Sequence, residues 1–92
     1  MVQHSFVYVL SGEGLTPPRV GVCAEPAARL ATILIGWSRK GMQPSHYEMW
    51  AAPSTDGYKH KRVIAAALLK DGSNPKAVLR EVCGVEPEAV TI

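Results

Sequence analysis

Three spaced elements decide the fold: Phe6-Val7-Tyr8, then ten residues, then Arg19-Val20-Gly21, then seven residues, then Arg29. The first element belongs to a strand that carries a phenol, and the second is a strand that ends in a glycine. The third lies one turn into a helix and presents a guanidinium group. Arg offers a planar fork of donors to phosphate oxygens, and Tyr offers a positioned hydroxyl. The spacing therefore predicts a phosphate-binding surface at one edge of a small sheet.

The strands follow from apolar alternation and from turn residues. Residues 4–10 predict a strand with apolar side chains on both faces, which is typical of a central strand. Residues 11–18 are rich in Gly and Pro and predict a loop, which leads to a second strand over 19–23. The short connection predicts a hairpin. A third strand is expected over residues 46–52.

The helices follow from capping signals and from helical spacing. Pro26 favours the first position of a helix that starts at residues 25–26 and ends at Gly41. Further helices are expected over residues 58–70 and 74–82, the latter with Asn74 as its N-cap. The apolar residues of the first helix predict one buried stripe, made of Leu30, Ile33, Leu34 and Trp37.

The order of these elements predicts an α+β fold in which a small three-stranded antiparallel sheet is covered by helices. We expect one domain over residues 1–92, because 92 residues with 47% apolar and 20% charged side chains suit a single globular core. The longest apolar stretch, residues 30–37, is too short for a membrane span, and the N-terminus has no signal-peptide pattern. We therefore expect a cytoplasmic protein with no membrane partner.

The cysteines and histidines predict neither a disulfide nor a zinc site. Cys23 and Cys83 are far apart in sequence and have no secretory features around them, which favours buried free thiols. His4, His46 and His60 are isolated in the sequence, so they do not support a structural zinc site.

The formal net charge of +2 is too small to indicate nucleic-acid binding by itself. Its distribution is more informative, because residues 59–62 form a compact basic run and Arg39-Lys40 forms a second. Such runs are commonly solvated helix ends, but both follow a predicted core element and can flank one groove. The candidate phosphate-binding residues are Arg19, Arg29, Lys59, Lys61 and Arg62.

The three-element spacing resembles that of the GIY-YIG nuclease superfamily. Phe6-Val7-Tyr8 stands where the family has GIY, Arg19-Val20-Gly21 where it has YIG, and Arg29 where it has a helix arginine. The stretch RVGVCAEPAARL, residues 19–30, is similar to a phage-associated branch whose second motif tends to read KIG. The resemblance covers roughly the first third of the chain, and it implies a GIY-YIG-like fold and divalent-metal-dependent endonuclease chemistry.

The resemblance also implies catalytic roles for individual residues. Tyr8 would lie beside the metal-bound water, Arg29 would stabilise the phosphate, and Arg19 occupies the position of the second tyrosine. A guanidinium cannot act as a general base, so Arg19 changes the chemistry at that position. The family's metal-binding glutamate has no evident counterpart on the later helix. Glu48, on the preceding strand, is the candidate carboxylate for Mg²⁺ if the protein cleaves.

The favoured interpretation is a GIY-YIG-like domain with lost or weakened cleavage, which binds nucleic acid or serves as a phage or mobile-element accessory protein. Two alternatives stay open. One is an active metal-dependent endonuclease that uses Tyr8, Arg29 and Glu48, and the other is a protein-interaction or inhibitor module that uses the fold without nucleic acid. Residues 68–92 also resemble a helix-turn-helix, but its second helix would begin with Glu86-Pro87-Glu88, and these acids would repel phosphates. We interpret that pattern as packing geometry, and residues 86–92 are expected to begin a short helix or to return as a strand.

Overall fold

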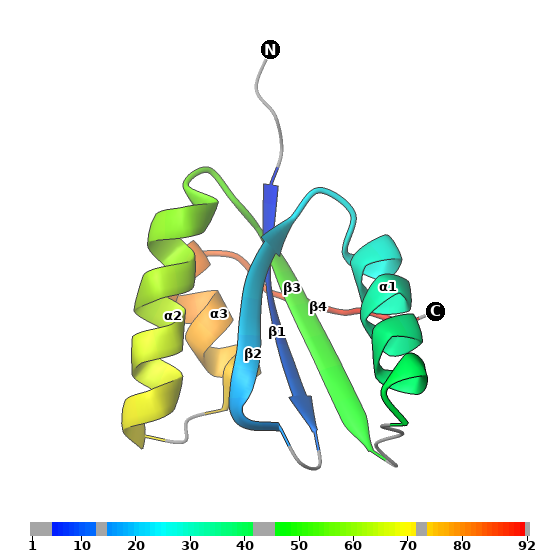
Figure 1. The fold of residues 1–92 in the computed structure, drawn as a ribbon. Helices are drawn as coiled ribbons and strands as arrows, with labels where there is room; N and C mark the ends of the chain where they lie inside the picture. Colours follow the sequence, from blue (N-terminus) through cyan, green and yellow to red (C-terminus); the bar gives the residue numbers. More distant parts are fainter. Residues whose placement is uncertain (1–4, 13–14, 42–45, 72–73, 92) are drawn as a thin grey trace.

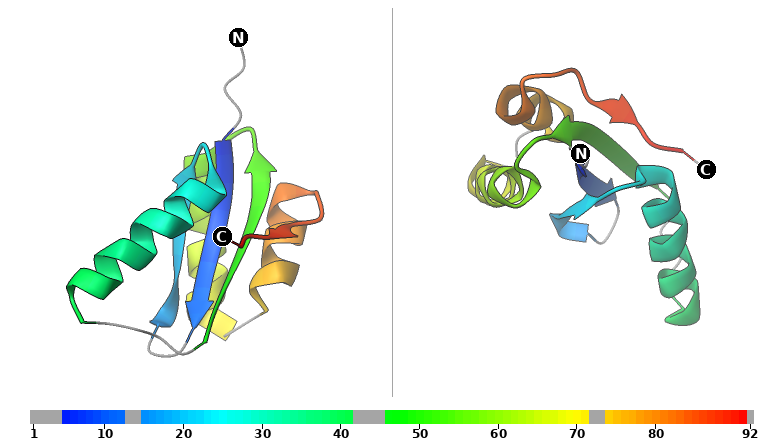
Figure 2. Two further views of the ribbon diagram at one scale, coloured as in Figure 1. Left: turned by 90° about the vertical axis from the view of Figure 1, so that its right-hand side faces the viewer. Right: turned by 90° about the horizontal axis from the view of Figure 1, so that it is seen from above.

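The computed structural model describes residues 5–12, 15–41, 46–71 and 74–91. The strands form one antiparallel sheet of four strands in the order β2-β1-β3-β4, with α1 on one face and α2 and α3 on the other (Figures 1 and 2). The predicted α+β class is confirmed. The elements are β1 (Ser5–Gly12), β2 (Leu15–Cys23), α1 (Pro26–Arg39), β3 (Tyr47–Ser54), α2 (Gly57–Asp71), α3 (Pro75–Cys83) and β4 (Glu88–Ala89).

Strand β1 is central and is buried on both faces, as its sequence predicts. Tyr8 and Leu10 pack against the α1 side of the sheet, where Leu30 and Trp37 of α1 complete a core. The alternate residues Val7 and Val9 face α2 and α3 in a second core. Because successive side chains of a strand point to opposite faces, one strand serves both cores.

The sheet has one strand more than the three predicted. Residues 88–89 pair with β3 through Trp50↔Ala89 and Ala51↔Glu88, and the Val90 N–H donates to the Met49 carbonyl at 2.8 Å. The helix that the helix-turn-helix pattern would begin at Glu86 is therefore not formed. Helix α3 ends at Cys83 and is capped by Gly84, whose φ of 74° is left-handed, and the chain then returns to the sheet, where residues 88–89 are extended.

Strand β2 is longer than predicted, because residues 15–18 belong to it and not to the preceding loop. β2 lies at the edge of the sheet and pairs with β1. Pro lacks an N–H and is tolerated on an edge strand, where one side of the backbone needs no ladder partner. The position of β2 therefore explains how Pro17 and Pro18 fit within a strand.

The predicted helices are confirmed with small changes at their ends. Helix α1 starts at Pro26 and is followed by Gly41 with a φ of 74°, and α2 starts one residue earlier than predicted. Asn74 caps α3, since its Oδ1 accepts a hydrogen bond from the Lys76 N–H at 2.9 Å. The predicted stripe of α1 is buried at Leu30, Ile33 and Trp37 and partly buried at Leu34.

Gly21 of β2 provides the space that the Tyr8 ring occupies. The two residues are opposite each other in the β1–β2 ladder. A Cβ atom built on Gly21 would lie 2.6 Å from Cε2 of Tyr8, well inside van der Waals contact. The Tyr8 side chain is 3% exposed, so its ring has no room to move aside without disturbing the core. The glycine of the second motif is thus required by packing.

We expect Gly21→Ala to lower the free energy of unfolding by about 1–3 kcal/mol, because the added methyl overlaps the buried Tyr8 ring. Denaturant-induced unfolding monitored by circular dichroism measures the change. Gly36→Ala is the matched control, since nothing lies within 4 Å of its Cβ position. This change in the middle of α1 should raise stability by about 0.5–1 kcal/mol. Equal effects of the two substitutions would contradict the packing argument.

Candidate functional site

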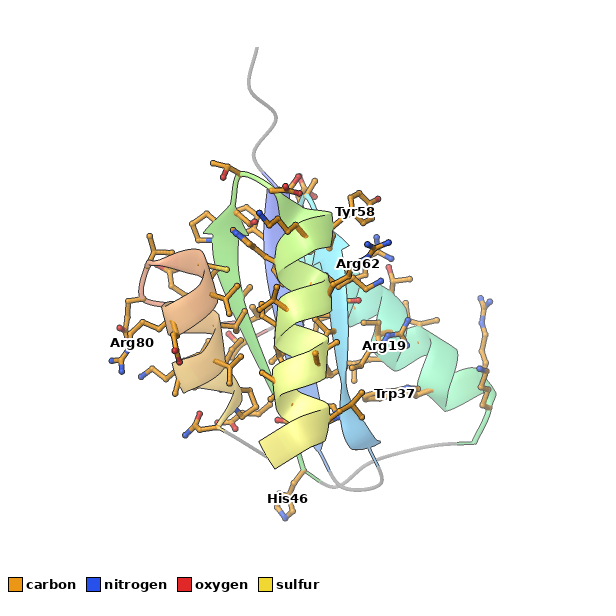
Figure 3. The ribbon with its side chains drawn as sticks, turned by 90° about the vertical axis from the view of Figure 1, so that its left-hand side faces the viewer. Arg19, Trp37, His46, Tyr58, Arg62 and Arg80 are labelled. Atoms are coloured by element: carbon orange, nitrogen blue, oxygen red, sulfur yellow. The ribbon has the colours of Figure 1, made fainter. Side chains whose placement is uncertain are left out.

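Arg19 lies on β2 on the same face of the sheet as Tyr8. It is opposite Leu10 in the β1–β2 ladder, and Leu10 belongs to the core under α1. Directly paired residues share a face, so Arg19 and Gly21 both lie on the α1 side. The Arg19 side chain is exposed at the edge of the sheet (Figure 3).

Arg29 approaches the carboxyl end of β2 from α1. It is exposed and lines a shallow hollow of about 420 Å³ together with Cys23, Glu25 and Thr32. Burial raises the pKa of the Cys23 thiol, and the positive charge of Arg29 partly opposes this rise. The guanidinium of Arg29 therefore lies near the last residue of β2.

Arg62 approaches β2 from the opposite face of the sheet. Helix α2 packs on β2, and a Cβ on Gly57 would lie 2.8 Å from Cγ1 of Val22. Arg62 follows Gly57 by five residues, which corresponds to about 7.5 Å along the helix axis. The same distance along β2 spans about two residues, because a strand rises by about 3.3 Å per residue. Helix α2 runs back along β2 (Figure 1), and Figure 3 shows Arg62 on the β2 side of α2, with Arg19 further along the same margin.

The basic run over residues 59–62 is divided between two sides of α2. Lys59 and Lys61 lie on opposite sides, because two residues advance a helix by about 200°. His60 contacts Cys83 of α3, so Lys59 lies toward the α3 side and Lys61 toward β2. Lys61 is half-buried and Lys59 is exposed. Arg62 and Lys61 therefore flank β2, whereas Lys59 does not.

Four basic residues thus border one edge of the sheet, and we refer to Arg19, Arg29, Lys61 and Arg62 as the basic edge. The ion pairs formed among the described residues join Lys76 and Arg80 to Glu86, at 3.6 and 3.8 Å. None of these ion pairs among the described residues includes Arg19, Arg29, Lys61 or Arg62. Its positive charges are therefore available to an anionic ligand.

Tyr8 shares the face of Arg19 but belongs to the core. At 3% exposed, its ring packs beneath α1 and does not form part of an open phosphate site. Sequence reasoning identifies the correct face for Tyr8 because the ladder follows from the hairpin. It does not identify the depth of the ring, which depends on how closely α1 covers β1.

Glu48 is not brought to Tyr8. Its neighbour Met49 lies in the core under α1 with Tyr8, so alternation places Glu48 on the opposite face, where it pairs with Ser11. Glu25 lines the same hollow as Arg29, but a lone carboxylate beside a guanidinium is a weak cation ligand. Over the described ranges, no group of three His, Cys, Asp or Glu residues can hold a metal ion. The residues around Tyr8 and Arg29 do not fit a magnesium site.

His60 is isolated in the sequence but has close polar neighbours in the fold. Its Nδ1 lies 2.6 Å from Ser54 Oγ and 4.0 Å from Cys83 Sγ, and Ser54 Oγ also accepts the Asp56 N–H at 3.2 Å. Burial raises the pKa of the Cys83 thiol, which keeps it protonated and poorly nucleophilic. The cluster joins the ends of β3 and α3 to the first turn of α2, and it serves packing. His46 is exposed at the start of β3, and His4 lies outside the described residues.

Both cysteines are free thiols, and Cys23 is buried as expected, whereas Cys83 is half-buried. The tryptophans are covered and do not form exposed anchors. Trp37 is 7% exposed and makes an edge-on contact with Tyr47, with ring centroids 6.4 Å apart. Trp50 is half-buried and lies under the Lys76 ammonium, 5.0 Å from the ring centroid. An apolar hollow of about 610 Å³ lies between the start of α1 and the C-terminal segment and includes Glu86 and Glu88.

Comparison with known protein families, curated proteins and solved structures gives no match for this chain. The described helices include none that is both long and apolar enough to cross a membrane.

We expect Arg29→Ala to raise the pKa of the Cys23 thiol further, because the change removes the one charge that opposes desolvation there. The pH dependence of Cys23 alkylation in a Cys83→Ala background measures this pKa. Arg29→Lys should keep much of the effect, and Arg39→Ala, at the far end of α1, should leave the titration unchanged. An unchanged titration in Arg29→Ala would show that the guanidinium does not lie at this end of β2.

Proposed function

We propose that this protein is a GIY-YIG-like domain that binds nucleic acid along the basic edge and has lost or weakened metal-dependent cleavage. The observation that carries the proposal is the convergence of Arg19, Arg29, Lys61 and Arg62 on β2 from both faces of the sheet. Two different helices and the strand itself supply these cations. A phosphate backbone lying along β2 would meet positive charge on each side.

The geometry of β2 suits such a ligand. β2 is an edge strand, so one side of it is bordered by β1 and the other is open among the described elements. Phosphate contacts from Arg and Lys supply most of the affinity of sequence-independent nucleic-acid binding. Because the basic edge is distributed along the strand and not gathered at one point, it favours a polymeric anion over a single phosphate.

Loss or weakening of cleavage is supported by two side chains. Arg19 holds the position at which the resemblance places a second tyrosine, and its guanidinium cannot accept a proton. Glu48 lies on the face of the sheet opposite Tyr8, so it cannot complete a metal site there. Among the described residues, the basic edge could thus bind phosphate, whereas Glu48 and Arg19 are not placed to activate water beside Tyr8.

The protein-interaction alternative has less support from the surface. Interface hot spots are typically desolvated aromatic anchors. Trp37 is already buried in the core, and Trp50 is half-buried beneath Lys76. Neither tryptophan is free to insert into a partner, so the two aromatic anchors that this alternative would use are not available.

We expect binding to short oligonucleotides to weaken as salt concentration rises, because phosphate contacts release counterions. Arg19→Ala and Arg62→Ala should each reduce the slope of log affinity against log salt by about one unit. Fluorescence anisotropy across a salt series measures the slope.

Arg80→Ala is the matched control for these variants, since Arg80 is also exposed but lies on α3, away from β2, and pairs with Glu86 (Figure 3). It should leave the slope unchanged. Absence of binding at low salt, or an equal effect of all three substitutions, would remove the nucleic-acid proposal.

We expect little or no Mg²⁺-dependent cleavage of plasmid or branched DNA, because the residues around Tyr8 and Arg29 do not fit a magnesium site. Gel electrophoresis after incubation with and without the metal measures cleavage. Robust cleavage that needs metal and disappears in Arg29→Ala would support the endonuclease alternative, with Glu48→Gln and Glu25→Gln as the first ligand tests. Glu81→Gln on α3 is the control for general effects of lost negative charge.

A further inference from the structure

Tyr58 leaves a large aromatic ring in solvent. It is the second residue of α2 and is 75% exposed, the highest value among the exposed large hydrophobic residues of the described chain. By contrast, Ile64 and Leu68, which anchor this helix to the core, are 0% and 4% exposed. The ring therefore contributes little to the core, and packing does not account for it.

Tyr58 lies on the same side of α2 as Arg62, because residues four apart share a helix face. Figure 3 shows both side chains along the margin of α2 that borders β2, with Arg19 next in the row. The packing of Gly57 on Val22 places this first turn at the carboxyl end of β2, the end where Arg29 also lies. Tyr58 is thus adjacent to the basic edge.

We infer that Tyr58 is a stacking platform for an unpaired base, and that the basic edge binds single-stranded nucleic acid in preference to duplex. This inference rests on the proposed function and specifies its substrate class. Proteins that bind single strands combine a positively charged path for the backbone with aromatic rings on which bases stack. Arg62 supplies the charge one helical turn from the Tyr58 ring, so a phosphate and its base can be held by neighbouring side chains.

A duplex cannot use this arrangement fully. Its bases are stacked on each other, so they can reach an exposed ring only after being unpaired, which costs a few kcal/mol. The four cations would still contact its phosphates. Tyr58 therefore adds affinity for single strands alone, and it should discriminate by structure and not by sequence, since every base has an aromatic face.

The test compares the affinity of the full chain for one labelled oligonucleotide as a single strand and as a blunt duplex, in DNA and in RNA. The protein should bind the single strand more tightly than the duplex for DNA, for RNA or for both. The nucleic acid that shows this preference identifies the sugar that the protein prefers. Tyr58→Ala should weaken single-strand binding by about 5- to 150-fold and leave duplex binding unchanged. Tyr58→Phe should retain the affinity, because it keeps the ring.

Leu69→Ala is the matched control, since Leu69 is 68% exposed on the same helix but offers no aromatic face. Circular dichroism verifies that each variant is folded. Equal affinities for single strand and duplex, or equal losses in Tyr58→Ala and Leu69→Ala, would overturn the stacking inference. If Arg62→Ala still weakened binding in that case, the proposed function would stand. Absence of binding to every oligonucleotide would overturn both.

Discussion

Each side chain of β1 from Val7 to Leu10 is buried, two on either face of the sheet, so this strand needs cover on both sides. Helix α1 covers one face, and α2 and α3 cover the other. The chain crosses from one face to the other through β3, which pairs with β1 on the side away from β2. The need to bury both faces of one short apolar strand therefore sets the order of layers in a chain of only 92 residues.

Because β1 is central, β2 lies at an edge of the sheet, with α1 on one face and α2 on the other. Arg29 and Arg62, one on each of these helices, then lie beside the strand from opposite faces. Charge on an edge strand also discourages association of one sheet with another, and Arg19 is an exposed charge on such a strand. If the protein binds nucleic acid as we propose, the basic edge combines protection of the sheet edge with attraction of an anion.

Tyr8 and Gly21 connect the fold to the motif. The spacing of the two motifs suggests a phenol held next to an arginine at a phosphate site, and the ladder does put Arg19 and Tyr8 on one face. The close approach of the ring to Gly21 gives the glycine a packing role that needs no catalysis. In this chain, the motif residues contribute to stability through Tyr8 and Gly21 and contribute positive charge through Arg19 and Arg29.

The sequence alone determined the α+β class, the central position of β1 and the three helices, because these depend on local periodicity, Pro26 at a helix start and the Asn74 cap. Local signals could not decide between a short helix and a strand for the segment that contains β4, since a two-residue strand forms only where β3 offers it an edge. Only the tertiary structure decided which charges meet. The fold divides residues 59–62 between the two sides of α2, buries Tyr8 and separates Glu48 from Tyr8. Each of these outcomes depends on how helices and strands pack across the sheet. That geometry is not encoded within any short stretch of chain.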